Sequence, residues 1–75
     1  MITAEHIKQC IQTGLPDAKV EVMGEDGVHF EAIVISPSFR GKKILAQHRM
    51  VYDALGDKMK ADIHALTLRT QCPNE

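Results

Sequence analysis

The sequence predicts an α+β fold in which two helices pack on one face of a three-stranded mixed sheet. Its 75 residues allow a single domain. The spacing of its apolar residues changes between helical and strand periods and gives the order α-β-β-α-β. About 25 residues that include a helix separate the second strand from the third, and a connection of that length permits a crossover between parallel strands. Two helices on one face cover such a small sheet economically.

The first helix is predicted over residues 3–13. Thr3 is a suitable N-cap, because its hydroxyl can accept a hydrogen bond from the first turn. The apolar stripe of this helix consists of Ile7, Cys10 and Ile11. Gly14 suits the position just after the helix, and Pro16 prevents its continuation.

A hairpin follows the first helix. Residues 18–23 alternate between apolar and charged side chains, which indicates a half-buried strand. Residues 24–27 form a turn, since their Asp-Gly pair favours a tight hairpin. Residues 28–36 become apolar on both faces toward their end, which predicts a central strand.

The second helix and the last strand complete the predicted fold. The helix is expected over residues 43–58, after the chain-breaking segment 36–41. Its predicted apolar face consists of Ile44, Leu45, His48, Val51, Tyr52 and Leu55. The strand is expected over residues 62–69, with His64, Leu66 and Leu68 on one face. The domain is therefore predicted over residues 1–70, with a loose tail over 71–75.

Several functional classes lack support in the sequence. The formal net charge of -1 gives no overall electrostatic attraction for nucleic acid. The longest wholly apolar run, residues 32–35, is far too short to span a bilayer, and residues 1–5 do not resemble a signal peptide. Cys10 and Cys72 cannot form a disulfide framework, so we expect a cytoplasmic protein. We find no nucleophile motif and no phosphate-binding loop, and we expect no enzymatic activity.

Four histidines are the main candidates for chemistry. His6 is expected on the solvated side of the first helix, and His29 on the exposed side beside the hairpin turn. His48 falls on the apolar stripe of the second helix, where a structural histidine bonded to the 36–41 loop is expected. For His64 a structural role and a ligand role are both open. If His29 and His64 bind metal together, the remaining ligands must come from a partner or a small thiol, and an iron–sulfur cluster would meet that need.

A second candidate site is a group of cations around the start of the second helix. It consists of Arg40, Lys42, Lys43 and Arg49, and residues 32–52 contain no Asp or Glu. Gly41 within this group permits a close approach of the backbone. The group could be an ordinary solvated surface, or it could bind a phosphate backbone or an acidic partner.

Three linked motifs resemble the BolA family. The first is Phe-x-Gly, carried by Phe39 and Gly41, and the second is His-Arg-x-Val-x-x-x-Leu over residues 48–55. The third is Ile-His-Ala-Leu over residues 63–66. With the Asp-Gly hairpin and the first helix, the resemblance covers nearly the whole chain. The Gly-x-His-Phe sequence at 27–30 and the short length resemble the IbaG branch.

The resemblance implies a class II KH-like fold and a role without catalysis. It implies a cytosolic monothiol glutaredoxin as partner, with a 2Fe-2S cluster shared between the two proteins and glutathione. His64 would be one cluster ligand and His29 the other, while His48, Gly41 and Phe39 would be structural. Family members have also been linked to transcriptional control, so a nucleic-acid-binding stress-response regulator that uses residues 40–49 is the alternative. Many relatives continue into a terminal helix, and contacts made by such a helix are not expected here.

Overall fold

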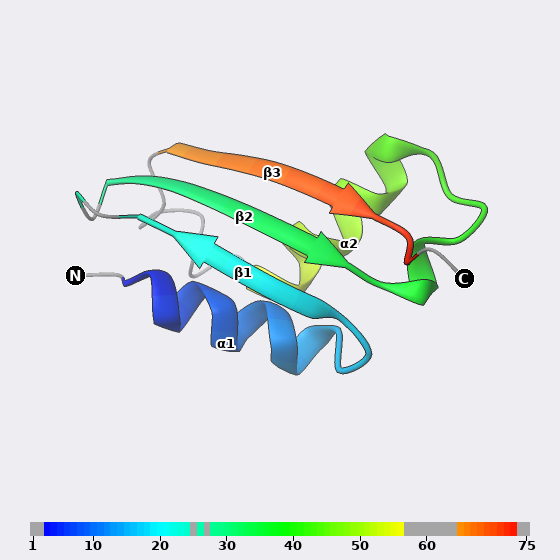
Figure 1. Ribbon diagram of the computed structural model, residues 1–75, viewed down its shortest axis with the longest axis horizontal. Coiled ribbons are helices and arrows are strands. Elements are labelled where there is room, and N and C mark those ends of the chain that lie inside the picture. Colours follow the sequence, from blue (N-terminus) through cyan, green and yellow to red (C-terminus); the bar gives the residue numbers. More distant parts are fainter. Residues whose placement is uncertain (1–2, 25, 27, 57–64, 74–75) are drawn as a thin grey trace.

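The structure is a computed structural model, and it describes residues 3–24, 26, 28–56 and 65–73. The elements follow the predicted order, with a short 3-10 helix added before the second helix (Figure 1). They are α1 (Ala4–Gly14), β1 (Lys19–Met23), β2 (His29–Ile35), η1 (Pro37–Phe39), α2 (Ile44–Leu55) and β3 (Ala65–Gln71). The predicted α+β class is therefore confirmed.

The three strands form one mixed sheet in the order β1-β2-β3. β1 and β2 are antiparallel, and Met23 pairs with Glu31 near their hairpin. β2 and β3 are parallel, with His29 opposite Ala65 at one end and Ile35 opposite Gln71 at the other. The long connection through α2 thus makes a crossover, and β2 is the central strand, as its apolar sequence predicts.

The core lies between the sheet and the two helices. In β1 and β2 the even-numbered residues point inward, and buried residues of both helices join the same cluster. This cluster includes Ile7, Ile11, Val20, Phe30, Ala32, Val34, Val51 and Leu55. In Figure 1, α1 lies next to β1 and α2 runs behind β2 and β3. Both helices therefore cover one face, as predicted.

α1 begins at the predicted cap, but the glycine at its end has a different role from the predicted one. The Thr3 hydroxyl accepts a hydrogen bond from the His6 backbone nitrogen at 3.1 Å, which confirms the cap. Gly14 is the last helical residue, and the only glycines described with positive φ are at positions 41 and 56. A Cβ at Gly14 would collide with Ala54 of α2. The glycine lets the two helices approach each other, and its predicted position just after the helix is wrong.

α2 is rotated about its axis relative to the prediction. Its buried residues are Gln47, Val51 and Leu55, whereas Ile44, Leu45 and Tyr52 are exposed and His48 is only half-buried. The hydrogen bonds to the preceding loop come from the Gln47 amide, which reaches the Lys42 carbonyl at 2.7 Å. Gln47 also accepts a hydrogen bond from the Thr70 hydroxyl of β3 at 2.6 Å. The prediction that His48 bonds to this loop is therefore wrong, because Gln47 makes these hydrogen bonds. Hydrophobic periodicity does not indicate that a polar residue such as Gln47 can be buried and held by hydrogen bonds.

The last strand begins within the predicted span and ends at Gln71, two residues later than predicted. Leu66 and Leu68 both pack against the core, so they share one face of the strand as predicted. Ile63 and His64 lie outside the described residues. Among the residues that the structure describes, neither helix has the length and apolar character needed to cross a bilayer.

Candidate metal centre and cation patch

His29 stands at the first position of β2, directly after the hairpin turn. Its side chain is 74% exposed, in agreement with the expected surface position. In the parallel register it lies opposite Ala65, the first residue of β3. The fold therefore places this imidazole at the end of the sheet where β3 begins.

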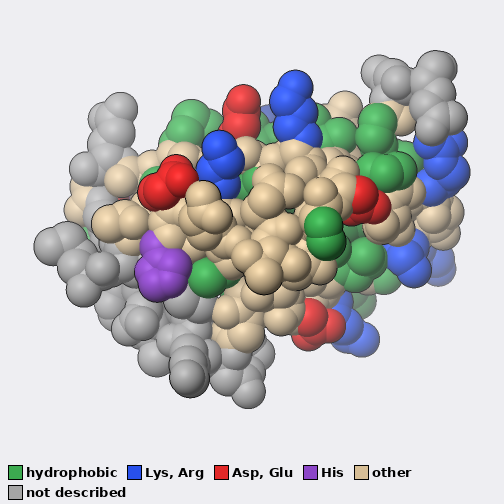
Figure 2. Space-filling view, turned by 90° about the horizontal axis from the view of Figure 1, so that it is seen from below, with side chains coloured by type: hydrophobic (Ala, Val, Ile, Leu, Met, Phe, Trp, Pro, Cys, Tyr) green, Lys and Arg blue, Asp and Glu red, His purple; other side chains and the backbone are tan. Residues whose placement is uncertain are grey.

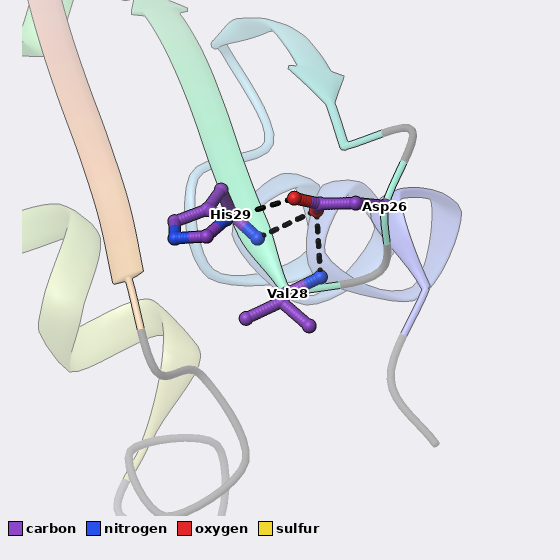
Figure 3. Close-up of polar contacts among 3 residues, drawn as sticks. All are labelled: Asp26, Val28 and His29. Atoms are coloured by element: carbon purple, nitrogen blue, oxygen red, sulfur yellow. Dashed lines mark hydrogen bonds and ion pairs between the residues drawn. The ribbon is translucent and has the colours of Figure 1, made fainter.

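Asp26 holds His29 from within the same turn (Figure 3). One carboxylate oxygen accepts hydrogen bonds from the backbone nitrogens of Val28 at 2.9 Å and His29 at 2.8 Å. The other lies 2.8 Å from Nδ1 of the His29 ring. The contact with the His29 ring, and then the two backbone bonds, hold the pKa of Asp26 well below its usual range.

This arrangement determines which ring nitrogen of His29 can bind a ligand. An ionised Asp26 can only accept hydrogen bonds, so Nδ1 must carry the hydrogen that lies between them. In the neutral ring, Nε2 then keeps its lone pair. A carboxylate behind a histidine in this way fixes the ring and raises its basicity in many metal sites.

A shallow hollow of about 450 Å³ opens beside this histidine. Its lining comes from the hairpin and the adjoining strands: Met23, Gly24, Asp26, His29, Phe30, Glu31 and Thr67. Gly24 has no space for a side chain, because a Cβ there would collide with the Phe30 ring. The hollow lies on the surface, where a group brought by another molecule can reach His29.

The described residues contain no group of three or more His, Cys, Asp or Glu side chains that could hold a metal ion. Cys72 follows the far end of β3 from Ala65, about 20 Å along a seven-residue strand. Cys10 is half-buried in α1. A metal at His29 would thus need ligands from outside the described residues. His64, the second predicted ligand, lies outside the described residues.

The predicted cations lie at the opposite end of the molecule. Arg40 and Lys42 belong to the loop after η1, Lys43 is the N-cap of α2, and Arg49 lies on the exposed side of that helix. Figure 1 places this loop at the far end of the sheet from the hairpin, and the longest dimension of the molecule is 37 Å. Lys and Arg side chains gather at that end in Figure 2. The structure does not bring the cations and His29 into one site.

The residues predicted as structural occupy different environments. Phe39 is buried at 1% exposure. Gly41 has a φ of 76°, a conformation that favours glycine, and a Cβ there would meet no neighbour. His48 lines a hollow of about 550 Å³ with Leu45, Arg49, Tyr52 and Asp53.

The sequence pattern does not reveal the roles of three residues at these sites, Asp26, Leu45 and Tyr52. The pattern identifies Asp26 only as a turn residue, although an Asp three positions before a histidine can cap the turn and hydrogen-bond to the ring. The periodicity predicts Leu45 and Tyr52 in the core, and nothing in it distinguishes them from the buried positions. Their exposure follows from the rotation of α2 around Gln47.

Comparison with known proteins identifies relatives over most of the chain. Residues 5–75 match the family described as BolA-like protein. The solved structure of a bolA protein homologue from Coxiella burnetii is 51% identical and superposes with a TM-score of 0.85, covering 97% of this chain and 94% of that one. The DNA-binding transcriptional regulator BolA of Escherichia coli K12 is 28% identical, over 93% of this chain and 75% of that protein. SufE-like protein 1 of Arabidopsis thaliana is 40% identical over 53 residues, which are 69% of this chain but only 14% of that protein.

Proposed function

The chain belongs to the BolA family, and on that premise we propose that it is an adaptor that shares a 2Fe-2S cluster with a monothiol glutaredoxin. Its role would be iron–sulfur cluster trafficking or iron and redox sensing. The observation that carries the proposal is the exposed His29 ring, whose Nδ1 is held by Asp26 and whose Nε2 is free to bind.

The sheet register supports His64 as the second ligand. His29 lies opposite Ala65 in the parallel pair, and His64 is bonded directly to Ala65. Ala65, the sequence neighbour of His64, thus lies at the same end of the sheet as His29. Two imidazoles from this chain would complement thiolates from the glutaredoxin and from glutathione.

Histidine ligands give such a cluster distinct properties. An imidazole is neutral, whereas a thiolate is charged, so replacing two thiolates on one iron raises the reduction potential. Imidazole can also be protonated near neutral pH, so the shared cluster would be more sensitive to acid than one held by thiolates alone. Asp26 would keep the His29 ring oriented toward the partner.

The test is visible-region circular dichroism of a cluster-loaded monothiol glutaredoxin titrated anaerobically with this protein. A new spectrum that saturates at equal amounts of the two proteins is expected. His64→Ala should abolish that spectrum and His29→Ala should alter it. His6→Ala is the matched control, because His6 is an exposed histidine on α1 and is not among the described residues that line the hollow beside His29. An unchanged glutaredoxin spectrum, or equal effects of all three variants, would contradict the proposal.

A nucleic-acid-binding regulator is the alternative. It draws on the name of the Escherichia coli relative and on the four cations around the start of α2. However, Ile44 and Leu45 are exposed among these cations, and a phosphate backbone gains nothing from covering apolar side chains. The same surface is therefore better suited to a protein.

A further inference from the structure

Helix α2 exposes a stripe of large apolar side chains beside its buried face. Leu45 is 72% exposed, Ile44 59% and Tyr52 38%. Leu45 and Tyr52 line the hollow of about 550 Å³ that also includes His48. We name the stripe Ile44, Leu45, His48 and Tyr52 the α2 stripe. No other part of the described chain buries the α2 stripe, although the neighbouring residues Val51 and Leu55 of the same helix belong to the core.

Positive charge lies at the start of the α2 stripe and along one border of it. Lys42 and Lys43 precede it, and Arg49 lies along its border. The whole chain has nine Lys and Arg against ten Asp and Glu, but residues 32–52 hold four of the cations and none of the acids. The rest of the chain therefore carries five cations against ten acids. Among the described residues that line the hollow, Asp53 is the one acidic side chain.

We propose that the α2 stripe is a docking surface for an acidic amphipathic helix of a partner protein. Apolar side chains of that helix would enter the hollow between Leu45 and Tyr52, and its flanking carboxylates would meet Lys42, Lys43 and Arg49. Amphipathic helices bind apolar grooves in this way, and charges at the rim set the orientation. Charge complementarity selects an acidic partner helix over a basic one.

This surface is independent of the His29 site. The hairpin and the start of β3 lie at one end of the molecule, whereas η1 and the start of α2 lie at the other (Figure 1). The hollows at the two sites share no described residue, so a partner at one site need not use the side chains of the other.

The test uses a synthetic acidic amphipathic peptide of about 18 residues, with Leu on one face and Glu beside it. Its charge-inverted counterpart carries Lys in place of Glu. Backbone amide NMR of the protein should show saturable shifts along α2 with the acidic peptide and none with the basic one. Leu45→Ser should weaken binding by about tenfold, as expected for an anchor side chain. Met23→Ser is the matched control, because Met23 is an exposed apolar residue at the other end of the molecule.

Charge variants separate this proposal from its competitors. Reversal of Lys42 and Lys43 to Glu should also abolish acidic-peptide binding, while Lys19→Glu on β1 should leave it unchanged. Binding that ignores Leu45→Ser, or no shifts at millimolar peptide, overturns the proposal. A DNA duplex that binds through the lysines and is unaffected by Leu45→Ser would assign the surface to nucleic acid instead. Self-association that Leu45→Ser abolishes would assign it to a second copy of this chain.

Discussion

A single carboxylate in the hairpin, that of Asp26, fixes the orientation of the His29 ring. The two oxygens of Asp26 accept three hydrogen bonds, two from backbone nitrogens and one from the ring. The turn and the orientation of the imidazole thus depend on the same side chain. A ring that is 74% exposed would otherwise rotate freely and exchange its hydrogen between both nitrogens.

Asp26→Asn should therefore change the tautomer of His29. An amide has a single oxygen and cannot accept all three hydrogen bonds. We expect ring nitrogen-15 shifts to show mainly the Nδ1–H form of the neutral ring in the wild type, and a mixture of both forms in the variant. His6 serves as an internal control in the same spectra. Identical His29 shifts in the two proteins would show that Asp26 does not orient the ring, whether or not a cluster binds.

At the scale of single residues, the sequence predicts the exposure of a side chain better than it predicts the side chain's hydrogen-bond partners. The exposure of His29 follows from its place beside a turn, and the structure confirms it. The contact with Asp26 depends on turn dihedral angles that residue patterns do not specify. The role of Gln47 was missed for a similar reason, since its three partners are carbonyls and a hydroxyl from other segments.

At the scale of helices and strands, the contact between α1 and α2 depends on Gly14 having no side chain. Gly14 approaches Ala54 so closely that a Cβ would overlap it. Gly14→Ala should cost about 1–3 kcal/mol of unfolding free energy, as overpacking usually does, despite the better helix propensity of alanine. Chemical denaturation measures this loss.

The double variant Gly14→Ala/Ala54→Gly provides the control for that prediction. It moves the methyl group from one helix to the other, so the added cost of Gly14→Ala should largely vanish in the Ala54→Gly background. Additive losses would mean that the two helices are not in the close contact that the structure describes.

Element order, sheet type and strand faces could be predicted because each depends on local periodicity and connection length. The rotation of α2 could not, since it depends on which side chains the loop and β3 can hydrogen-bond. As a result Leu45 and Tyr52, assigned to the core, became the strongest candidates for an interface.

For the whole molecule, the stability in acid depends on a link between distant segments. Asp17, before β1, accepts hydrogen bonds from the hydroxyls of Ser36 at 2.8 Å and Ser38 at 2.5 Å. The bond from Ser38, and then that from Ser36, lowers the pKa of Asp17. Because the folded pKa lies below the unfolded value of about 3.9, this stabilisation is fully present above that value. It is lost as the pH falls through the folded pKa.

Asp17→Asn should therefore be less stable than the wild type at neutral pH, and the difference should shrink below about pH 4. Thermal unfolding followed over a series of pH values measures it. Glu21→Gln removes an exposed carboxylate of β1 and is the matched control. A constant difference between Asp17→Asn and wild type at every pH would contradict the assignment.

The parallel pairing of β2 with β3 also has a consequence for the order of synthesis. β1, β2 and α2 leave the ribosome before β3. Until β3 has been synthesised, the edge of the seven-residue strand β2 that pairs with β3 has no partner strand. The antiparallel hairpin can form early, but the sheet cannot close until the crossover is complete. A nascent chain stalled after α2 would present an open strand edge, the kind of surface that recruits chaperones or pairs with another unfinished chain.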